Sequence, residues 1–378
     1  MLLELHILQN FAPSNLNRDD TGSPKTCEFG GYRRARISSQ AIKRAIRREF
    51  DVSHLVPEEQ RAIRSKRFVE RIAEGLVRTG RPADLAPGVA EAGLALLDIA
   101  LAKDNKTQYL LYLGAAEVDR IVAFCDAQWE PLAAAATAEK KSAKKGAQDE
   151  GAKKLAKELQ TALDGGRAAD LALFGRMLAD LPERNIDAAS QVAHAISTHQ
   201  VSSEFDYYTA VDDLKPEDTA GADMIGTVEF NSACYYRYAN VDLAQLKKNL
   251  GGDEALAEAT VRAFLVASRD AIPTGKQNSF AARNAPSFIM TVVRPAGAWS
   301  LANAFVNPVR PSGHGIIANS IAALDQHWGD LTGVYGAPTG ASVAFVATGE
   351  AELANLGAAR VATFNELLER TVTAAGGS

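Results

Sequence analysis

Residues 29–50 read FGGYRRARISSQAIKRAIRREF, and the pattern changes partway through this stretch. Residues 32–37 alternate in a way that predicts a strand. Ser38 or Ser39 is a suitable N-cap for a helix over 40–50, where apolar residues recur at helical spacing. The stretch therefore predicts a strand, a turn and an amphipathic helix.

The same stretch concentrates positive charge. It holds seven basic residues against the single acid Glu49, whereas the whole chain of 378 residues carries a net charge of −5. On the expected helix, Lys43 and Arg47 are four residues apart, as are Arg44 and Arg48, and both pairs flank the apolar stripe. The first turn also offers backbone N–H groups that favour anions. These features favour a site for a phosphate polymer over a merely solvated helix face.

Outward from this stretch the chain predicts an α+β fold with a helical excursion. Residues 58–185 are rich in alanine, leucine and charged residues at helical spacing, and residues 201–226 are acidic and loop-like, typical of an extended hairpin. Strands are expected at 2–8, 226–241, 287–294 and 341–348, and helices at 186–200, 253–271 and 350–373.

Composition restricts the class of protein. With 47% hydrophobic and 23% charged residues the chain is typical of soluble globular proteins, and no apolar run is long enough to span a membrane. The alternating N-terminal residues read as a half-buried strand rather than as a signal peptide. Cys27, Cys125 and Cys234 lie far apart, which fits a reducing compartment, so we expect a cytoplasmic protein.

The sequence carries few signs of catalysis. GxGxxG, GxxxxGK[ST] and GxSxG are absent, and His194 and His199 are five apart, unlike paired metal ligands on a helix. We therefore expect no metal, no cofactor and no enzymatic activity. The acidic pairs Asp19–Asp20 and Asp212–Asp213 leave open a metal-dependent nuclease as the alternative.

Two further groups of residues allow a functional or an ordinary interpretation. Lysines at 140, 141, 144 and 145 could contact phosphates without sequence preference, or could belong to a solvated segment. Met177, Tyr207 and Tyr208 stand beside polar, loop-like sequence. They could fill a core, or they could stack on unpaired bases.

Ordered blocks along the chain resemble the backbone subunit of the type I-E CRISPR Cascade complex, the CasC family. The first block is SNLNRDD followed by FGGYRRARISSQAIKRAIR, and the resemblance continues through DLALFGRM, VAHAISTHQVSSEFDYYTAVDDL and GTVEFNSACYYRYANVDLAQLKKNLGG to GKQNSFAARNAP and SLANAF. Residues 55–165 resemble the family least.

The resemblance implies a right-hand shape with an RRM-like (ferredoxin-like) palm, an inserted helical fingers domain and a thumb loop. It assigns residues 1–57 and 227–378 to the palm, 58–185 to the fingers, 186–200 to a palm helix and 201–226 to the thumb. The interleaved aromatics of a standard RNA-binding RRM sheet are absent, so such a palm would bind RNA in another way.

The resemblance also implies partners and a role. About six copies would stack as a helical filament along a CRISPR RNA, flip out every sixth nucleotide and present the bases between for pairing with target DNA. The protein would assemble with the large, small, 5′-handle-capping and 3′-hairpin endoribonuclease subunits of Cascade. A recruited helicase–nuclease would cut the DNA, and no membrane would be involved.

Carried over position by position, the resemblance assigns RNA contacts to a set of basic, polar and stacking residues. The set is Arg18, Lys25, Ser38, Gln40, Lys43, Arg44, Arg47, Met177, Tyr207, Tyr208, Lys276 and Gln277. Arg34 and Arg36 are further candidate RNA contacts, because they are the basic residues of the expected strand in residues 29–50. Lys140, Lys141, Lys144 and Lys145 resemble a fingers segment that holds duplex DNA.

Overall fold

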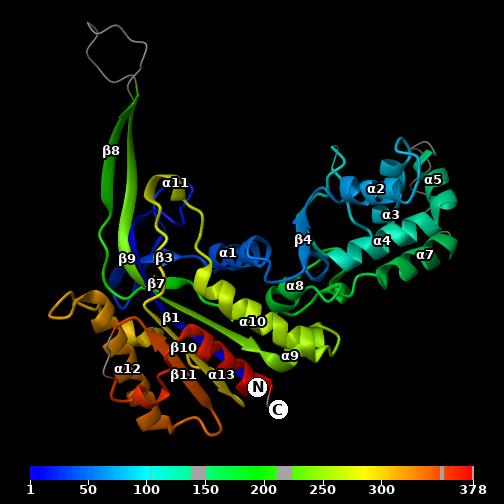
Figure 1. Cartoon of the computed structure of the whole chain (residues 1–378). Helices are drawn as coiled ribbons and strands as arrows, with labels where there is room; N and C mark the ends of the chain where they lie inside the picture. The colour runs from blue at the N-terminus through cyan, green and yellow to red at the C-terminus, as the bar shows by residue number, and fades with distance from the viewer. Residues whose placement is uncertain (103, 138–149, 211–223, 350–352, 377–378) are drawn as a thin grey trace, which may run out of the picture. The chain divides into compact units, whose positions relative to one another are not determined.

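The computed structural model describes the chain as an α+β protein in which two compact units can be distinguished (Figure 1). The described residues are 1–102, 104–137, 150–210, 224–349 and 353–376. The first unit comprises 1–55, 191–243 and 261–378, and the second comprises 56–190 and 244–260. In the described ranges no helix combines the length and apolar character that a membrane span requires.

An antiparallel sheet forms the centre of the first unit. Its strand order is β11-β10-β1-β9-β7-β3-β2. The strands are β1 (Leu2–Ser14), β2 (Thr26–Phe29), β3 (Tyr32–Ile37), β7 (Ala195–Ser197), β9 (Met224–Asp242), β10 (Phe288–Arg294) and β11 (Ser342–Ala347).

The order of elements along the chain identifies the core of this unit. β1 is followed by the paired strands β2 and β3 and then by helix α1 (Ser39–Val52). β7, β9, helix α10 (Glu254–Asp270) and β10 come later in the chain. In the sheet these strands stand in the order β10-β1-β9-β7, all antiparallel. This is the βαββαβ arrangement of a ferredoxin-like fold. The expected class of palm is therefore confirmed.

β1 is buried on both faces, whereas its alternation of apolar and polar residues predicts a half-buried strand. Leu5 and Ile7 line a small internal cavity together with Ile42 of α1. Glu4 and His6 point to the opposite face, where they are also buried. Helix α12 (Gly315–Tyr335) and the short η3 (Leu301–Phe305) pack there against β1, β9 and β10. The sequence analysis did not identify α12.

The prediction of a helix at 186–200 is wrong. This segment instead contains the short strands β6 (Ser190–Val192) and β7, and Ile196 and Ser197 pair with Tyr236 and Tyr235 of β9. Alanines recur at helical spacing here, but β-branched residues lie between them and favour strands. Pairing with two neighbouring strands therefore decides the structure of this segment.

The extended hairpin expected at 201–226 is confirmed for its described residues. β8 (Glu204–Ala210) pairs with the first part of β9, from Glu204 opposite Phe230 to Ala210 opposite Met224. Residues 231–242 of the same strand pair with β1. β9 is 19 residues long, so one continuous strand serves both the hairpin and the sheet (Figure 1).

The remaining elements of the first unit follow the expected pattern closely. β10 and β11 match the strands expected at 287–294 and 341–348. The C-terminal helix α13 spans Phe364–Gly376 and is shorter than the expected 350–373 at its start, where η4 (Gly357–Ala359) stands instead. A short helix, α11 (Gln277–Phe280), precedes β10.

The second unit is mainly helical, as its composition predicts. Its core joins apolar residues of successive helices, including Phe68, Ile72, Leu94 and Ile121. The helices are α2 (Phe68–Arg78), α3 (Ala86–Leu96), α4 (Ala115–Ala127), α5 (Trp129–Thr137), α7 (Glu150–Gln160), α8 (Ala169–Phe174) and α9 (Leu243–Asn249), with η1 (Glu58–Gln60) and η2 (Pro182–Arg184). The strands β4 (Ala62–Ser65) and β5 (Leu111–Gly114) form a separate small sheet.

Candidate nucleic-acid interface

Helix α1 begins as its sequence predicts, with Ser38 as the N-cap. The Oγ of Ser38 accepts a hydrogen bond from the amide of Ala41 at 3.3 Å, and the amide of Ser38 donates to Oδ1 of Asn17 at 2.8 Å. Because Ile42, Ile46 and the other apolar residues of the stripe are buried, the polar residues of the helix are turned outward.

A groove of about 610 Å³ runs beside the start of α1. Its lining includes Gln40, Arg44 and Arg48 of the helix, Arg18 of the preceding loop and residues 273–275. The lining residues are Leu16, Asn17, Arg18, Asp19, Asp20, Gly22, Ser38, Gln40, Ala41, Arg44, Ala45, Arg48, Pro273, Thr274 and Gly275. The groove therefore joins expected contact residues from two parts of the chain with the segment 273–275 from a third.

Gly275 explains how the third of these parts reaches the groove. A Cβ at this position would lie 2.4 Å from the carbonyl oxygen of Leu16 and 2.6 Å from that of Asn15. Only glycine therefore permits this close approach. Lys276 follows at once in a left-handed conformation, and Nε2 of the Gln277 side chain donates to the carbonyls of Pro273 and Ala282 at 3.2 Å. Gln277 thus serves to fix the loop that carries Lys276.

The exposed charged side chains that line the groove are three arginines and two acids, a small excess of positive charge. Arg18, Arg44 and Arg48 are exposed, and so are Asp19 and Asp20. Oδ1 of Asp19 accepts hydrogen bonds from the hydroxyl of Thr21 and from the amides of residues 21 and 23. These bonds, led by the one from the Thr21 hydroxyl, lower the pKa of Asp19. Asp19 thereby closes its own loop.

A second cationic group, Lys25 and Arg36, lies at the start of α1 beside His194. Nε of Arg36 donates to the carbonyl of Thr26 at 3.2 Å, and Nδ1 of His194 accepts a hydrogen bond from the amide of Ser39 at 3.1 Å. Burial, and then the charges of Arg36 and Lys25, lower the pKa of His194. His194 was not predicted for this site, because only the pairing of β7 with β3 brings it here.

The side chain of Arg34 is fully buried, which contradicts the expected side-chain contact with RNA. Its Nη1 donates to the carbonyl of Ser197 at 3.1 Å, and its Nη2 donates to those of Phe305 and Val306 at 2.7 and 3.1 Å. Gly30, at φ +63°, lets the β2–β3 turn approach the same segment, since a Cβ there would lie 2.2 Å from the Val306 oxygen. Arg34 therefore ties β3 to its neighbours.

The remaining helix cations, Lys43 and Arg47, are partly buried on α1. Burial lowers the pKa of Lys43. Ser38 is buried and its hydroxyl is engaged as the helix cap, so its contribution to the surface is to fix where α1 begins. Among the predicted palm residues, Arg18, Gln40 and Arg44 are exposed and line the groove.

Tyr207 and Tyr208 lie on β8 of the hairpin and are 63% and 41% exposed. As neighbours on a strand they point to opposite faces, so they do not form one stacking surface. The Tyr208 ring lies over its cross-strand partner Gly226, where a Cβ would be 2.3 Å from Cζ of the tyrosine. In the second unit Met177 is 80% exposed, which excludes core filling for this residue.

Two expectations depend on residues outside the described ranges. Lys140, Lys141, Lys144 and Lys145 fall within 138–149, and the pair Asp212–Asp213 falls within 211–223. In the ranges that are described, no group of three or more His, Cys, Asp or Glu side chains is arranged to hold a metal ion.

Comparisons with known proteins place the chain among relatives. A chain of a solved structure titled "CRISPR RNA-guided surveillance complex, pre-nicking" is 31% identical with a TM-score of 0.85, and the match covers 99% of this chain and 100% of that one. A chain of another, titled "CRISPR RNA-guided surveillance complex", is 28% identical with a TM-score of 0.77 over the same shares. No curated protein matches the sequence. The model of the family described as "CT1975-like protein" matches residues 3–372, and the chain therefore belongs to this family.

Proposed function

We propose that this protein is the non-catalytic backbone subunit of a type I-E Cascade complex. It binds the sugar-phosphate backbone of a CRISPR RNA and polymerises along it as a filament of about six copies. It kinks the RNA at every sixth nucleotide and presents the bases between for pairing with target DNA, forming an R-loop. It acts in the cytoplasm with the other Cascade subunits, and a recruited helicase–nuclease performs the cutting.

The groove at the start of α1 is the observation that carries this proposal. Arg18 and Arg44 meet there at the start of α1, and the nearby Lys25 and Arg36 extend the cationic surface. Cationic side chains of this kind attract phosphates and do not read bases. Base pairing then supplies specificity, as in other RNA-guided systems. The similar solved chains, which belong to CRISPR RNA-guided surveillance complexes, support the same role.

Salt dependence of RNA binding tests the groove. The double variant Arg18→Ala, Arg44→Ala should bind every guide sequence more weakly than the parent protein. Because each lost phosphate contact on a single strand reduces the slope of log affinity against log salt by about 0.7, the double variant should lose about 1.4. Filter binding at a series of salt concentrations, with at least two unrelated RNAs, measures both effects.

Arg370→Ala is the matched control, since Arg370 is an exposed arginine on α13 of the same unit and does not line the groove. It should leave the slope unchanged. An unchanged slope in the groove double variant, or a loss confined to one RNA sequence, would contradict the phosphate-binding role.

A metal-dependent RNA endonuclease is the second candidate, because Asp19 and Asp20 both line the groove. The assembled complex, incubated with complementary RNA and Mg²⁺, tests it. The backbone proposal expects intact target RNA. Cleavage at six-nucleotide intervals that disappears in Asp20→Ala would establish the nuclease instead.

A further inference from the structure

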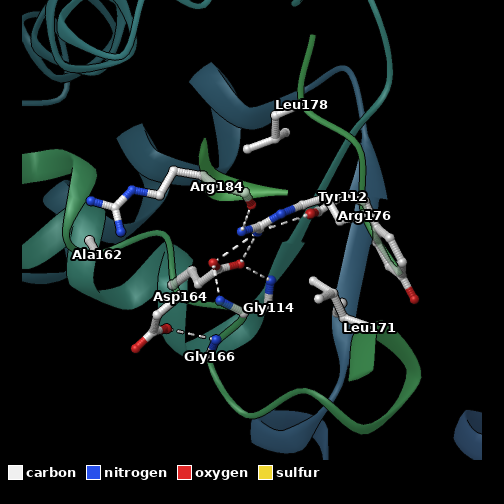
Figure 2. Close-up of polar contacts among 12 residues, drawn as sticks. Tyr112, Gly114, Ala162, Asp164, Gly166, Leu171, Arg176, Leu178 and Arg184 are labelled. Atoms are coloured by element: carbon white, nitrogen blue, oxygen red, sulfur yellow. Dashed lines mark hydrogen bonds and ion pairs between the residues drawn. The ribbon is translucent and has the colours of Figure 1, made fainter. Parts of the chain in front are cut away.

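A buried ion pair lies in the second unit beside Met177. The side chains of Glu117 on α4 and Arg176 are both 0% exposed. Nη1 of Arg176 donates to both carboxylate oxygens of Glu117, at 2.8 and 2.7 Å. The same carboxylate accepts hydrogen bonds from the backbone amides of Gly114 and Gly165, at 2.7 and 2.6 Å (Figure 2). This carboxylate is therefore held by four hydrogen bonds.

The pair anchors a loop that has little regular structure of its own. Nη2 of Arg176 donates to the carbonyl of Arg184 at 3.0 Å. The backbone of Arg176 exchanges two hydrogen bonds of 2.9 Å with Ile186, and the amide of Leu178 donates to Oδ1 of Asn185 at 2.6 Å. Since α8 ends at Phe174, these contacts fix the path of the chain on both sides of Met177.

Met177 itself behaves differently from its two neighbours. Counted over the whole residue, Arg176 and Leu178 are 5% and 2% exposed, whereas Met177 is 80% exposed. Gly175 makes this turn possible, because at φ +75° a Cβ would lie 2.9 Å from the backbone of residues 186 and 188. An apolar side chain is thus held in solvent by a backbone that is fixed immediately before and after it.

Stability alone does not account for the buried pair. Burying a carboxylate and a guanidinium costs desolvation energy, and packed hydrophobic residues of similar volume often stabilise as well or better. A pair with fixed hydrogen-bond geometry instead defines one conformation of the loop. We propose that Glu117 and Arg176 are positioning residues that hold Met177 in a fixed orientation for contact with an unstacked RNA base.

This inference rests on the proposed function, and its test separates the two. The full-length protein is assembled on guide RNAs in which 2-aminopurine, whose fluorescence reports stacking, occupies each position of the six-nucleotide repeat in turn. Four proteins are compared: the parent, Met177→Ala, Arg176→Lys and the double variant. Arg176→Lys keeps the charge beside Glu117 but cannot reproduce the planar set of donors.

Met177→Ala and Arg176→Lys should change the 2-aminopurine fluorescence at the same position of the repeat. Met177→Ala should change the fluorescence at one position of the repeat and weaken binding by about twofold to twelvefold, the range for a methionine–aromatic contact. Arg176→Lys should change the same position in the same direction. In the Met177→Ala background it should have no further effect, because the side chain that it positions is gone.

Two further variants keep the test decisive. Arg81→Lys alters another arginine–carboxylate pair of the same unit, with Asp126, and should leave the signal unchanged. Asn185→Ala removes the exposed side chain that accepts the hydrogen bond of the Leu178 amide. It should have the effect expected of Arg176→Lys, and it supplies the test if Arg176→Lys folds poorly.

The outcomes distinguish the inference from the proposed function. If Arg176→Lys and Asn185→Ala have the same effect in the Met177→Ala background as in the parent, the positioning role is overturned and the proposed function is not. A silent Met177→Ala would overturn the contact between Met177 and an RNA base, and the positioning role with it. If the effects of Arg176→Lys and Asn185→Ala disappear in the Met177→Ala background, the result supports both the positioning role and the proposed function.

Discussion

Arginines two residues apart on β3 serve different purposes, and burial separates them. Arg34 is fully buried and donates to three main-chain carbonyls, whereas Arg36 is partly exposed beside Lys25 and His194. The sequence shows only that both lie on one face of a strand. The partner of Arg34 is the segment around 305, which is remote in the sequence, so no local pattern could have revealed its burial.

Replacing Arg34 by alanine should destabilise the protein without changing its phosphate contacts. The variant leaves buried carbonyls without donors, at a cost of about 1–3 kcal/mol for each that stays unsatisfied. Urea titration should show the loss, while the salt slope of RNA binding stays unchanged. Arg33→Ala, at the exposed neighbouring position, is the control and should stay as stable as the parent. A fully stable Arg34→Ala protein with a reduced salt slope would return Arg34 to the RNA interface.

His6 should make stability depend on pH. Burial, together with the nearby charge of Arg294, lowers the pKa of His6 from 6.5 to about 3. The unfolded chain takes up a proton below pH 6.5 that the folded chain excludes, so this contribution is complete above that pH and is lost as the pH falls toward 3. Between about pH 7 and about pH 5 the loss amounts to about 2 kcal/mol.

Urea titrations of the parent and of His6→Gln at the two pH values measure this contribution. The variant should lose about 2 kcal/mol less than the parent on acidification, because glutamine does not titrate. Identical pH dependence in the two proteins would show that His6 is protonated without cost in the folded chain.

At the scale of elements, local signals and tertiary context can be separated. The N-cap Ser38 and the apolar stripe of α1 specify that helix from its own residues, and the structure begins it where the sequence predicts. The segment 186–200 carries no such cap or complete stripe. Its conformation is decided by edges offered by β3 and β9, which are invisible in the local sequence.

The candidate site was predictable in part from the sequence. The groove combines Arg18, Gln40 and Arg44, which the resemblance had identified, with residues 273–275. Gly275 brings this last segment in, and a lone glycine in a sequence does not reveal which backbone it approaches. For the same reason His194, on another strand, was not assigned to the surface that it shares with Arg36.

The hairpin offers a prediction at the scale of one element. Gly226→Ala should displace the Tyr208 ring, because the new Cβ would lie 2.3 Å from Cζ of Tyr208. If Tyr208 stacks on RNA, the variant should lose as much binding as Tyr208→Ala, about 1–3 kcal/mol per base. Filter binding measures the loss. Gly333→Ala is the control, because the space around this glycine is open, and it should bind like the parent. If Gly226→Ala also binds like the parent, Tyr208 does not contact the RNA.

At the scale of the whole molecule, an acidic chain can still bind a polyanion. The net charge is −5, yet exposed cations gather beside the start of α1. Binding depends on the local field rather than on net charge. Copies arranged along one RNA would repeat this surface at a fixed interval, so each copy needs only one cationic groove.

That interval is the central claim, and hydroxyl-radical footprinting of the protein assembled on a guide RNA tests it most directly. We predict a cleavage pattern that repeats every six nucleotides and keeps its phase when the guide sequence is changed. Met177→Ala and Tyr207→Ala should alter the pattern at fixed points of the repeat. Uniform protection, a pattern that follows the guide sequence, or a single footprint from one bound copy would contradict the account.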